Sequence, residues 1–463
     1  MKKYIVPILL SGVVLVTGCD KELEKPRPQA SLDNNSAITN AANADVALTG
    51  AYDILNSANY YGNQAVYFGD LAADATYQSG TFPTLFEIDN NAILPNNANT
   101  TNLWTTAYNG INRANNLISR MPTLADPILD AVVNGVKTRD RILGEATLLR
   151  SLHYFTLVRF FGSVPLVLTP TNGIDESVRV ARNSEEECYA QIVKDALDAE
   201  TLLPVAYAAA ADTRGRATRA AAQGLLSRIY LTRRQYREAA DKAALVLASP
   251  SYRLMATYGS IFTTKNSTES VWETQFNTTD QNGITFFYLQ APQGRRENAP
   301  AIELINAYTA GDQRLAASIS KIGSATAALT QANAVVSKYN RASTQDDPTY
   351  LIRTAEVILN RAEALAELSY PSAEALTLLN QVRTRAGLTA LTAAVVPTLA
   401  DFRRAMEQER FVEFAFEGHR WHDLKRTGRA LTVLKLTDAT KLLFPIPQRD
   451  RDANPNIVQN PGY

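Results

Sequence analysis

The chain has 463 residues, 46% of them hydrophobic and 20% charged, which suits one large folded domain or two to three ordinary ones. The chain has 46 lysines and arginines and 46 aspartates and glutamates. If a leader that contains Lys2 and Lys3 is removed, 44 basic residues remain against 46 acidic ones. Without a basic excess to neutralise phosphates, nucleic acid is excluded as a partner. The two cysteines exclude a disulfide framework, and Cys188 is predicted to be a small buried side chain.

Residues 1–18 have the pattern of a bacterial signal peptide. Two lysines precede an apolar run, Tyr4–Val16, which is too short for a transmembrane helix and is followed by Gly-Cys. The position of Cys19 resembles a lipobox, in which the cysteine is acylated and becomes the first mature residue. Val16 replaces the usual leucine of that motif, and plain secretion with cleavage elsewhere is the alternative. Several acyl chains on Cys19 would anchor the protein stably.

Residues 19–40 are predicted to form a tether between the lipidated cysteine and the fold. The stretch just after Cys19 is charged and contains proline, so it has little to bury. Its acidic and lysine residues also resemble the surface-export signal of Bacteroidota lipoproteins. No later segment is long and apolar enough to span a bilayer.

Apolar residues recur at steps of three and four in three stretches, which predicts helices at 45–56, 104–121 and 139–161. The third helix is predicted to stop at Gly162, with Pro165 following. Between the helices lie two polar stretches, 78–102 and 263–300, rich in Asn, Thr and Gly. Isolated aromatic residues within them are typical of a binding surface on loops.

Two segments, 217–247 and 350–388, are each predicted to form a pair of helices joined by a short turn. Alanines at the contact positions would let the paired helices approach closely. Both segments resemble tetratricopeptide units, although the full consensus is not kept. Such units generally build scaffolds and partner surfaces, not catalytic centres.

Four blocks of residues resemble the SusD/RagB family, in the same order along the chain. They are Tyr108 to Asn115; Gly144 to Leu166, with Arg150, Tyr154-Phe155 and Phe161-Gly162; Arg353 to Gly387, with Ala362-Glu363-Ala364 and Asn380 to Arg383; and Glu409 to Tyr463, with Phe416 to Trp421, Pro445 to Gln448 and the terminal Asn-Pro-Gly-Tyr. The separations and the preceding lipobox also agree with that family.

The resemblance implies a mostly α-helical, SusD-like fold: four tetratricopeptide-like helix pairs with a loop-rich ligand-binding part. We expect a single domain over 41–463. Its scaffold would comprise 41–60, 104–250 and 348–430, and its loop-rich part 61–103 and 251–347. The resemblance also implies a partner, a SusC-like TonB-dependent barrel of the outer membrane. Family members bind their ligand without changing it, so no catalytic residue and no cofactor are expected.

Catalytic and metal sites find little support in the residues themselves. His419 and His422 stand three positions apart, the spacing of metal ligands on a helix, yet the acidic and basic residues around them favour a structural ion network. The nucleophile-elbow and phosphate-loop patterns are missing from the sequence. Asp70 and Asp74 are the carboxylate pair to examine for a glycosidase, with capping and loop hydrogen bonding as the alternative.

The ligand-binding residues are predicted from the resemblance and from the loops. Trp104 and Asn109 lie where glycan-binding family members place an aromatic ring and an amide, and Asp74 where an acidic contact can occur. Thr106 departs from the family, where a long basic side chain can occur, and Trp104 also fits the buried stripe of its helix. The loops add further aromatic candidates: Tyr77, Phe82, Phe286, Phe287 and Tyr288.

The sequence therefore predicts a lipid-anchored protein on the cell surface of the outer membrane, which captures a nutrient oligomer and passes it to the barrel. A glycan is the expected ligand, because aromatic platforms cover sugar C–H faces while planar polar groups bind hydroxyls. The alternatives are a RagB-like peptide-import protein, a surface glycoside hydrolase, and an assembly scaffold without a small ligand.

Overall fold

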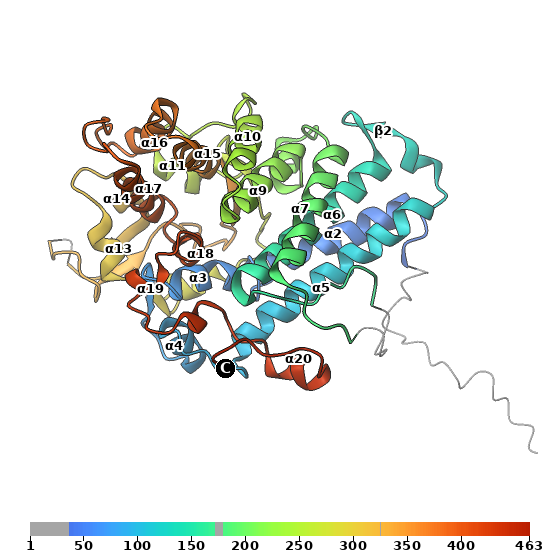
Figure 1. The fold of residues 1–463 in the computed structure, drawn as a ribbon, viewed down its shortest axis with the longest axis horizontal. Helices are drawn as coiled ribbons and strands as arrows, with labels where there is room; N and C mark the ends of the chain where they lie inside the picture. Colours follow the sequence, from blue (N-terminus) through green and yellow to red (C-terminus); the bar gives the residue numbers. More distant parts are fainter. Residues whose placement is uncertain (1–36, 172–178, 325) are drawn as a thin grey trace, which may run out of the picture.

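The computed structural model describes residues 37–171, 179–324 and 326–463, and helices are its main secondary structure (Figure 1). The predicted signal peptide, Cys19 and most of the predicted tether lie outside the described residues. Within the described ranges, no helix has both the length and the apolar character that crossing a bilayer requires.

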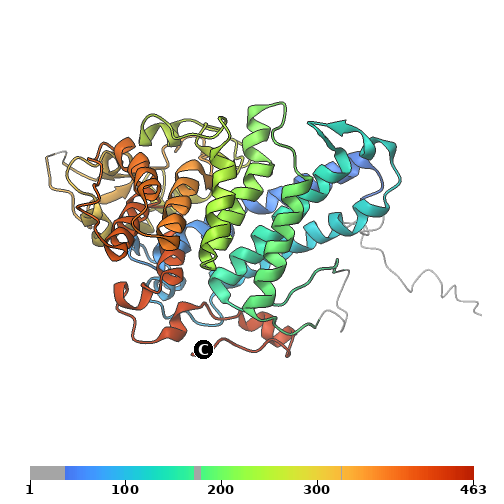
Figure 2. The same ribbon diagram turned by 45° about the horizontal axis from the view of Figure 1, so that its top comes forward.

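The long helices pack as successive pairs. The pairs are α2 (Ala41–Asn56) with α5 (Ala98–Arg120), α6 (Thr138–Phe161) with α7 (Glu185–Leu202), α9 (Arg219–Thr232) with α10 (Tyr236–Leu247), and α15 (Thr354–Leu368) with α16 (Ala373–Arg385). Adjacent pairs meet through α5 and α6, α7 and α9, and α10 and α15, which gives the row of helices in Figure 2.

The helices predicted at 45–56, 104–121 and 139–161 correspond to α2, α5 and α6, but α2 and α5 begin several residues earlier. Asparagine caps explain the earlier starts. The Asn40 side chain accepts a hydrogen bond from the N–H of Asn43, and the Asn97 side chain accepts from the first turn of α5. The stop of α6 at Gly162 is confirmed: the glycine has φ +72°, a left-handed conformation that favours glycine.

Close helix approaches depend on small residues. In the α5–α6 contact, a Cβ on Gly110 would lie 2.3 Å from Nε2 of His153. His153 itself is fully buried, and its Nδ1 lies 3.0 Å from the Tyr60 hydroxyl. Burial lowers the pKa of His153 to about 3, so the imidazole is neutral. In the α9–α10 contact, the Ser227 hydroxyl donates to the Ala239 carbonyl at 3.1 Å.

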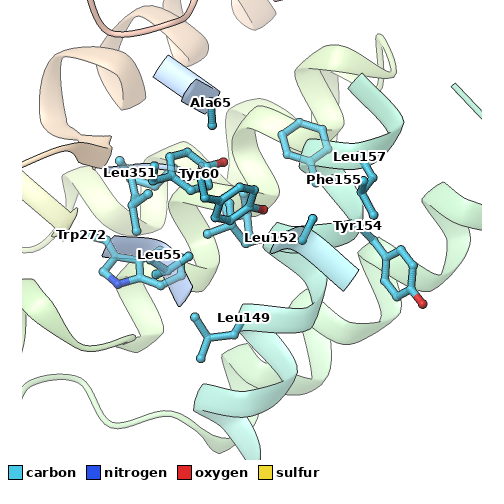
Figure 3. Close-up of a cluster of buried hydrophobic side chains, with 14 of the residues drawn as sticks. Leu55, Tyr60, Ala65, Leu149, Leu152, Tyr154, Phe155, Leu157, Trp272 and Leu351 are labelled. Atoms are coloured by element: carbon cyan, nitrogen blue, oxygen red, sulfur yellow. The ribbon is translucent and has the colours of Figure 1, made fainter. Parts of the chain in front are cut away.

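A continuous apolar core runs through the scaffold. Side chains of α2, α6 and two strands, β4 (Ser270–Glu273) and β8 (Tyr350–Arg353), gather in the part shown in Figure 3. The predicted burial of Cys188 is confirmed, because its side chain is fully enclosed in this core.

The second part of the molecule consists of short elements. They are α3 (Gln64–Leu71), β1 (Thr76–Gln78), α4 (Pro83–Asp89), α8 (Ala210–Gly215), α11 (Tyr258–Thr263), α12 (Ile284–Tyr288), β5 (Asn298–Pro300), α13 (Ile302–Ala307), α14 (Arg314–Ser318), β6 (Ile319–Lys321) and β7 (Ala334–Val336). The strands pair antiparallel as β1–β5, β4–β8 and β6–β7.

The β1–β5 pair brings together the two stretches that the sequence predicted to be loop-rich. Tyr77 lies opposite Ala299, so residues near position 80 meet residues near position 297. The stretch 61–103 contains α3, β1 and α4, and α3 is buried along its whole length.

The C-terminal part contains α17 (Leu399–Glu413), α18 (Arg420–Arg426), α19 (Ala430–Val433) and α20 (Gln448–Ala453). After α19 the chain returns to the end of α6. The Phe444 N–H donates to the Phe160 carbonyl at 2.8 Å, and the Asn460 amide donates to the carbonyl oxygens of Phe161 and Phe444. These contacts fix the C-terminal residues against the scaffold.

The ion network predicted around the C-terminal motif is present. Glu413 pairs with Arg314, Arg353 and Arg385, and Glu409 pairs with Arg314. A second group joins Arg410 and Arg426 to Asp423. All of these side chains are buried or nearly so.

A backbone contact between α3 and the turn before α18 allows a stability test. A Cβ on Gly69 would lie 2.2 Å from the Gly418 carbonyl oxygen, a backbone atom that cannot rotate away. We therefore expect Gly69→Ala to lower the free energy of unfolding by about 1–3 kcal/mol. Urea unfolding midpoints measure this.

Gly50→Ala is the matched control, since Gly50 also lies inside a helix but a Cβ there would only reach van der Waals contact with Arg113, at 3.4 Å. It should leave stability unchanged or raise it by up to about 1 kcal/mol. Equal midpoints for the two variants would contradict the close approach of Gly69.

Candidate ligand-binding surface

Three phenylalanines from the two loop-rich stretches meet around one arginine. The ring centres of Phe82 and Phe287 are 6.3 Å apart, and those of Phe286 and Phe287 are 5.2 Å apart. The Arg295 guanidinium carbon lies 4.9 Å from the centre of the Phe82 ring and 5.8 Å from that of Phe286. Below them, Phe287 stacks on the buried Tyr67. We call Phe82, Phe286, Phe287 and Arg295 the Phe82–Phe286 surface.

A buried carboxylate holds this surface in place. Glu297 is 1% exposed and lies 3.0 Å from an Arg295 nitrogen. The same carboxylate accepts hydrogen bonds from the Thr81 N–H at 3.1 Å and from the Gln78 amide at 3.0 Å. A Cβ on Gly80 would lie 1.6 Å from a Glu297 oxygen, so a larger residue would displace the carboxylate. The turn before Phe82 and the guanidinium of Arg295 are thus positioned by one group.

The surface keeps an accessible face. The Phe286 side chain is 40% exposed and the Arg295 side chain 48% exposed. A guanidinium paired on one side and open on the other can still donate hydrogen bonds to a ligand. Aromatic rings beside such a planar donor can take an apolar ligand face and its hydroxyls together.

The other loop candidates divide between the rim and the interior. Tyr77 is half-buried, and its hydroxyl donates to the Gln331 carbonyl and accepts from Arg296. Tyr288 is fully buried and stacks on Tyr339, although it belongs to the same helix as Phe286. Tyr288 therefore supports α12 from within and does not reach the surface.

Trp104 and Asn109 lie on different faces of α5. The Trp104 indole is 2% exposed and packs on Tyr108 and Phe161, and α20 lies against the same part of α5, where Arg449 donates a hydrogen bond to the Thr105 hydroxyl. Asn109 is exposed. The burial of Trp104 agrees with the core-packing alternative, and the structure does not bring these two residues together with the Phe82–Phe286 surface.

The carboxylate pair Asp70 and Asp74 is engaged within the protein. Asp74 accepts two hydrogen bonds from the Arg420 guanidinium, at 2.6 and 2.8 Å. Asp70 is fully buried and accepts from the Gly418 N–H at 2.9 Å. Burial raises the pKa of Asp70 to about 8, although the Gly418 hydrogen bond opposes the shift. Both side chains hold the segment from Gly418 to Arg420 in place.

The histidines next to this turn are part of the core. His419 stacks on Phe414, and His422 packs edge-on against Phe160. Burial and nearby arginines lower the pKa of both well below the usual value, so both rings are neutral. Across the part of the chain that the structure describes, no group of three or more histidine, cysteine or carboxylate side chains is placed to hold a metal ion.

A cavity of about 440 Å³ lies elsewhere, between α15, α17 and α18. Its buried arginines are paired: Arg410 and Arg426 with Asp423, and Arg420 with Asp74. The Phe82–Phe286 surface does not contribute to its lining. We assign no ligand to this cavity.

Sequence reasoning missed Arg295, which holds the surface together. The available signal was a pair of adjacent arginines, Arg295 and Arg296, directly after the aromatic stretch at 286–288. Phe86, 39% exposed, lies on α4 one turn after Phe82, within the polar stretch 78–102.

Comparison with known families matches most of the chain in two parts. A model of the SusD family matches residues 316–441, and a model described as starch-binding and associating with the outer membrane matches residues 23–231. The chain belongs to the SusD family. The expected mostly helical, tetratricopeptide-like SusD fold is confirmed. Because the glycan-binding members of the family are non-catalytic, this SusD-family protein is not an enzyme.

Individual relatives match along nearly their whole length. SusD-like protein P2 of Formosa agariphila is 26% identical, with both chains covered completely. A SusD homolog from Bacteroides thetaiotaomicron is 24% identical with a TM-score of 0.80, covering 94% of this chain and 99% of that one. A laminarin-binding SusD-like protein is 25% identical with a TM-score of 0.76, covering 92% and 100%.

Proposed function

We propose that this SusD-family protein captures a nutrient glycan at the Phe82–Phe286 surface and delivers it to a SusC-like TonB-dependent barrel of the outer membrane. The observation that carries the proposal is the half-exposed Arg295 guanidinium held between two aromatic rings, Phe82 and Phe286. A lipid on Cys19 would keep the protein at the cell surface.

The chemistry of the surface supports a saccharide. Sugars present flat C–H faces and rows of hydroxyls, so they need aromatic rings for the first and fixed planar donors for the second. Phe82 and Phe286 offer the rings, and Arg295 offers the donor, positioned by Glu297. Tyr77, held by Arg296, stands at the rim. In this proposal Trp104 and Tyr288 act from the interior, by positioning α5 and α12.

Family membership supports the import role. A related laminarin-binding protein shares the fold over nearly its whole length. The lipobox-like sequence before Cys19 supports a lipid anchor. A peptide ligand is the alternative, but the aromatic rings and the guanidinium of the surface match the C–H faces and hydroxyls of a sugar.

Calorimetric titration with soluble glycans and short peptides tests the proposal. We expect saturable heat with at least one glycan, and Phe286→Ala should weaken its affinity by roughly 30-fold, about 2 kcal/mol, because an aromatic anchor of a binding surface is lost.

Leu245→Ala on α10 is the control, since Leu245 is likewise exposed but lies on the scaffold, and it should leave affinity unchanged. Glycan binding that survives Phe286→Ala would move the site elsewhere. Heat with peptides alone would identify a peptide-import protein.

A further inference from the structure

Three aliphatic side chains stand out from the connection between α5 and α6. Ile128 is 64% exposed, Val132 68% and Val133 50%. Ile128 belongs to the 3₁₀ helix η2 (Pro127–Asp130), and the two valines form strand β2 (Val132–Val133), which pairs with β3 (Val136–Lys137). We call Ile128, Val132 and Val133 the hairpin tip.

The fold does not require apolar residues at the hairpin tip. Among the described residues, the strands pair only with each other, through a turn in which Asn134 and Gly135 both have positive φ. A Cβ on Gly135 would meet nothing within 4 Å, so the turn projects into solvent. The contact with the scaffold is made by Leu129, which is fully buried. Exposed aliphatic side chains that lie close together in the chain and have no packing role indicate a contact surface.

The hairpin tip lies beside the point where the described chain begins. Asp126 accepts a hydrogen bond from the Ala41 N–H at 2.8 Å with one carboxylate oxygen and from the Ile128 N–H at 2.9 Å with the other. One side chain thus joins the start of α2 to η2. In Figures 1 and 2, β2 and the start of α2 lie at the same end of the molecule.

The proposed lipid anchor, Cys19, is joined by a short length of chain to the end of the molecule that carries the hairpin tip. Cys19 stands 18 positions before Ala37, a chain length that can span at most about 65 Å. A lipid on Cys19 would therefore draw the molecule toward the bilayer through the end that carries the hairpin tip. Tethering raises the effective concentration of nearby groups at the membrane, so even a weak contact would form.

We propose that the hairpin tip rests on the lipid surface and sets the orientation of the anchored protein. This inference relies on the lipid anchor of the proposed function. Three aliphatic side chains at a projecting turn bind a bilayer weakly by themselves but add to an anchor that is already inserted. The charges near them are balanced, two acidic against two basic: Asp130 lies 3.7 Å from Lys137 and 3.9 Å from Arg139, and the Asp126 carboxylate also interacts with Arg139. The contact is therefore apolar and needs no anionic lipid.

A fluorescent label on the tip tests the contact. The full chain, lipidated in a bacterial host, is reconstituted into phosphatidylethanolamine–phosphatidylcholine vesicles that contain lipids with a quencher on the acyl chain. Val132→Cys carries an environment-sensitive label, and Val395→Cys, 60% exposed, carries the same label as the control. Cys188 is buried and does not react.

We expect quenching at position 132 to exceed that at position 395 by at least about threefold. Adding Ile128→Ser and Val133→Ser to the Val132→Cys protein should remove the difference. Equal quenching at the two positions overturns the contact, as does a difference that survives the serine substitutions, because proximity alone would then explain it.

The anchor is checked separately by detergent phase partition. A chain that stays in the aqueous phase overturns the anchor of the proposed function and this inference with it. A chain that enters the detergent phase but shows equal quenching overturns the inference alone.

Discussion

Replacing Glu413 by glutamine is expected to lower the free energy of unfolding by about 3–5 kcal/mol, as measured from urea unfolding. Glu413 is fully buried at the end of α17, and its carboxylate lies 2.6 Å from Arg353, 2.5 Å from Arg385 and 3.1 Å from Arg314. Burial alone would raise the pKa of Glu413, but the three guanidiniums outweigh burial and hold the pKa well below its usual value. A neutral amide would leave buried positive charge uncompensated.

The pH dependence of this effect has a definite sign. Because the pKa of Glu413 is lower in the folded state, its stabilisation is present above about pH 4.5 and is lost as the pH falls below that value. The difference between the wild-type protein and Glu413→Gln should therefore shrink in acid.

Asp198→Asn is the control for charge removal at the surface. Asp198 is 49% exposed and pairs with Lys194, which is itself 66% exposed. Its replacement should cost less than about 1 kcal/mol. If the two substitutions destabilise the protein equally, the buried network contributes no more to the free energy of unfolding than an exposed ion pair does.

The helical scaffold was predictable because its signals are local. Steps of three and four residues identified α2, α5 and α6, and Gly162 marked the end of α6. The helix starts were misplaced, since the asparagine caps at Asn40 and Asn97 precede the apolar repeats on which the prediction relied.

The candidate site was predictable only as a region. Aromatic residues in polar loops pointed to Phe82 and Phe286, but the pairing of β1 with β5 joins residues more than 200 positions apart. Arg295 and Glu297 gain their roles from that pairing alone. Likewise, periodicity cannot show that α20 lies against α5 beside Trp104, because the two helices are more than 300 positions apart in the chain.

The substitution Asp70→Asn, which keeps the shape of the side chain but removes its charge, should change how the free energy of unfolding depends on pH. Burial raises the pKa of Asp70 to about 8, so the folded protein binds a proton there that the unfolded chain releases above about pH 4. Asp70 therefore lowers stability progressively as the pH rises from about 4 to 8. In Asp70→Asn the amide oxygen can still accept from the Gly418 N–H, and this pH dependence disappears.

Relative to the wild-type protein, Asp70→Asn should gain stability by about 1.4 kcal/mol per pH unit, or about 3 kcal/mol between pH 5 and pH 7. Urea unfolding at pH 5, 6 and 7 measures the gain. Asp438→Asn is the control, because the hydrogen bonds from Thr440 lower the pKa of that exposed carboxyl and leave it ionised in both states over this range. If the stability difference between Asp70→Asn and the wild-type protein does not change with pH, Asp70 is ionised in the folded protein. The positive charge of Lys338, which lowers the pKa of Asp70, would then outweigh the effect of burial.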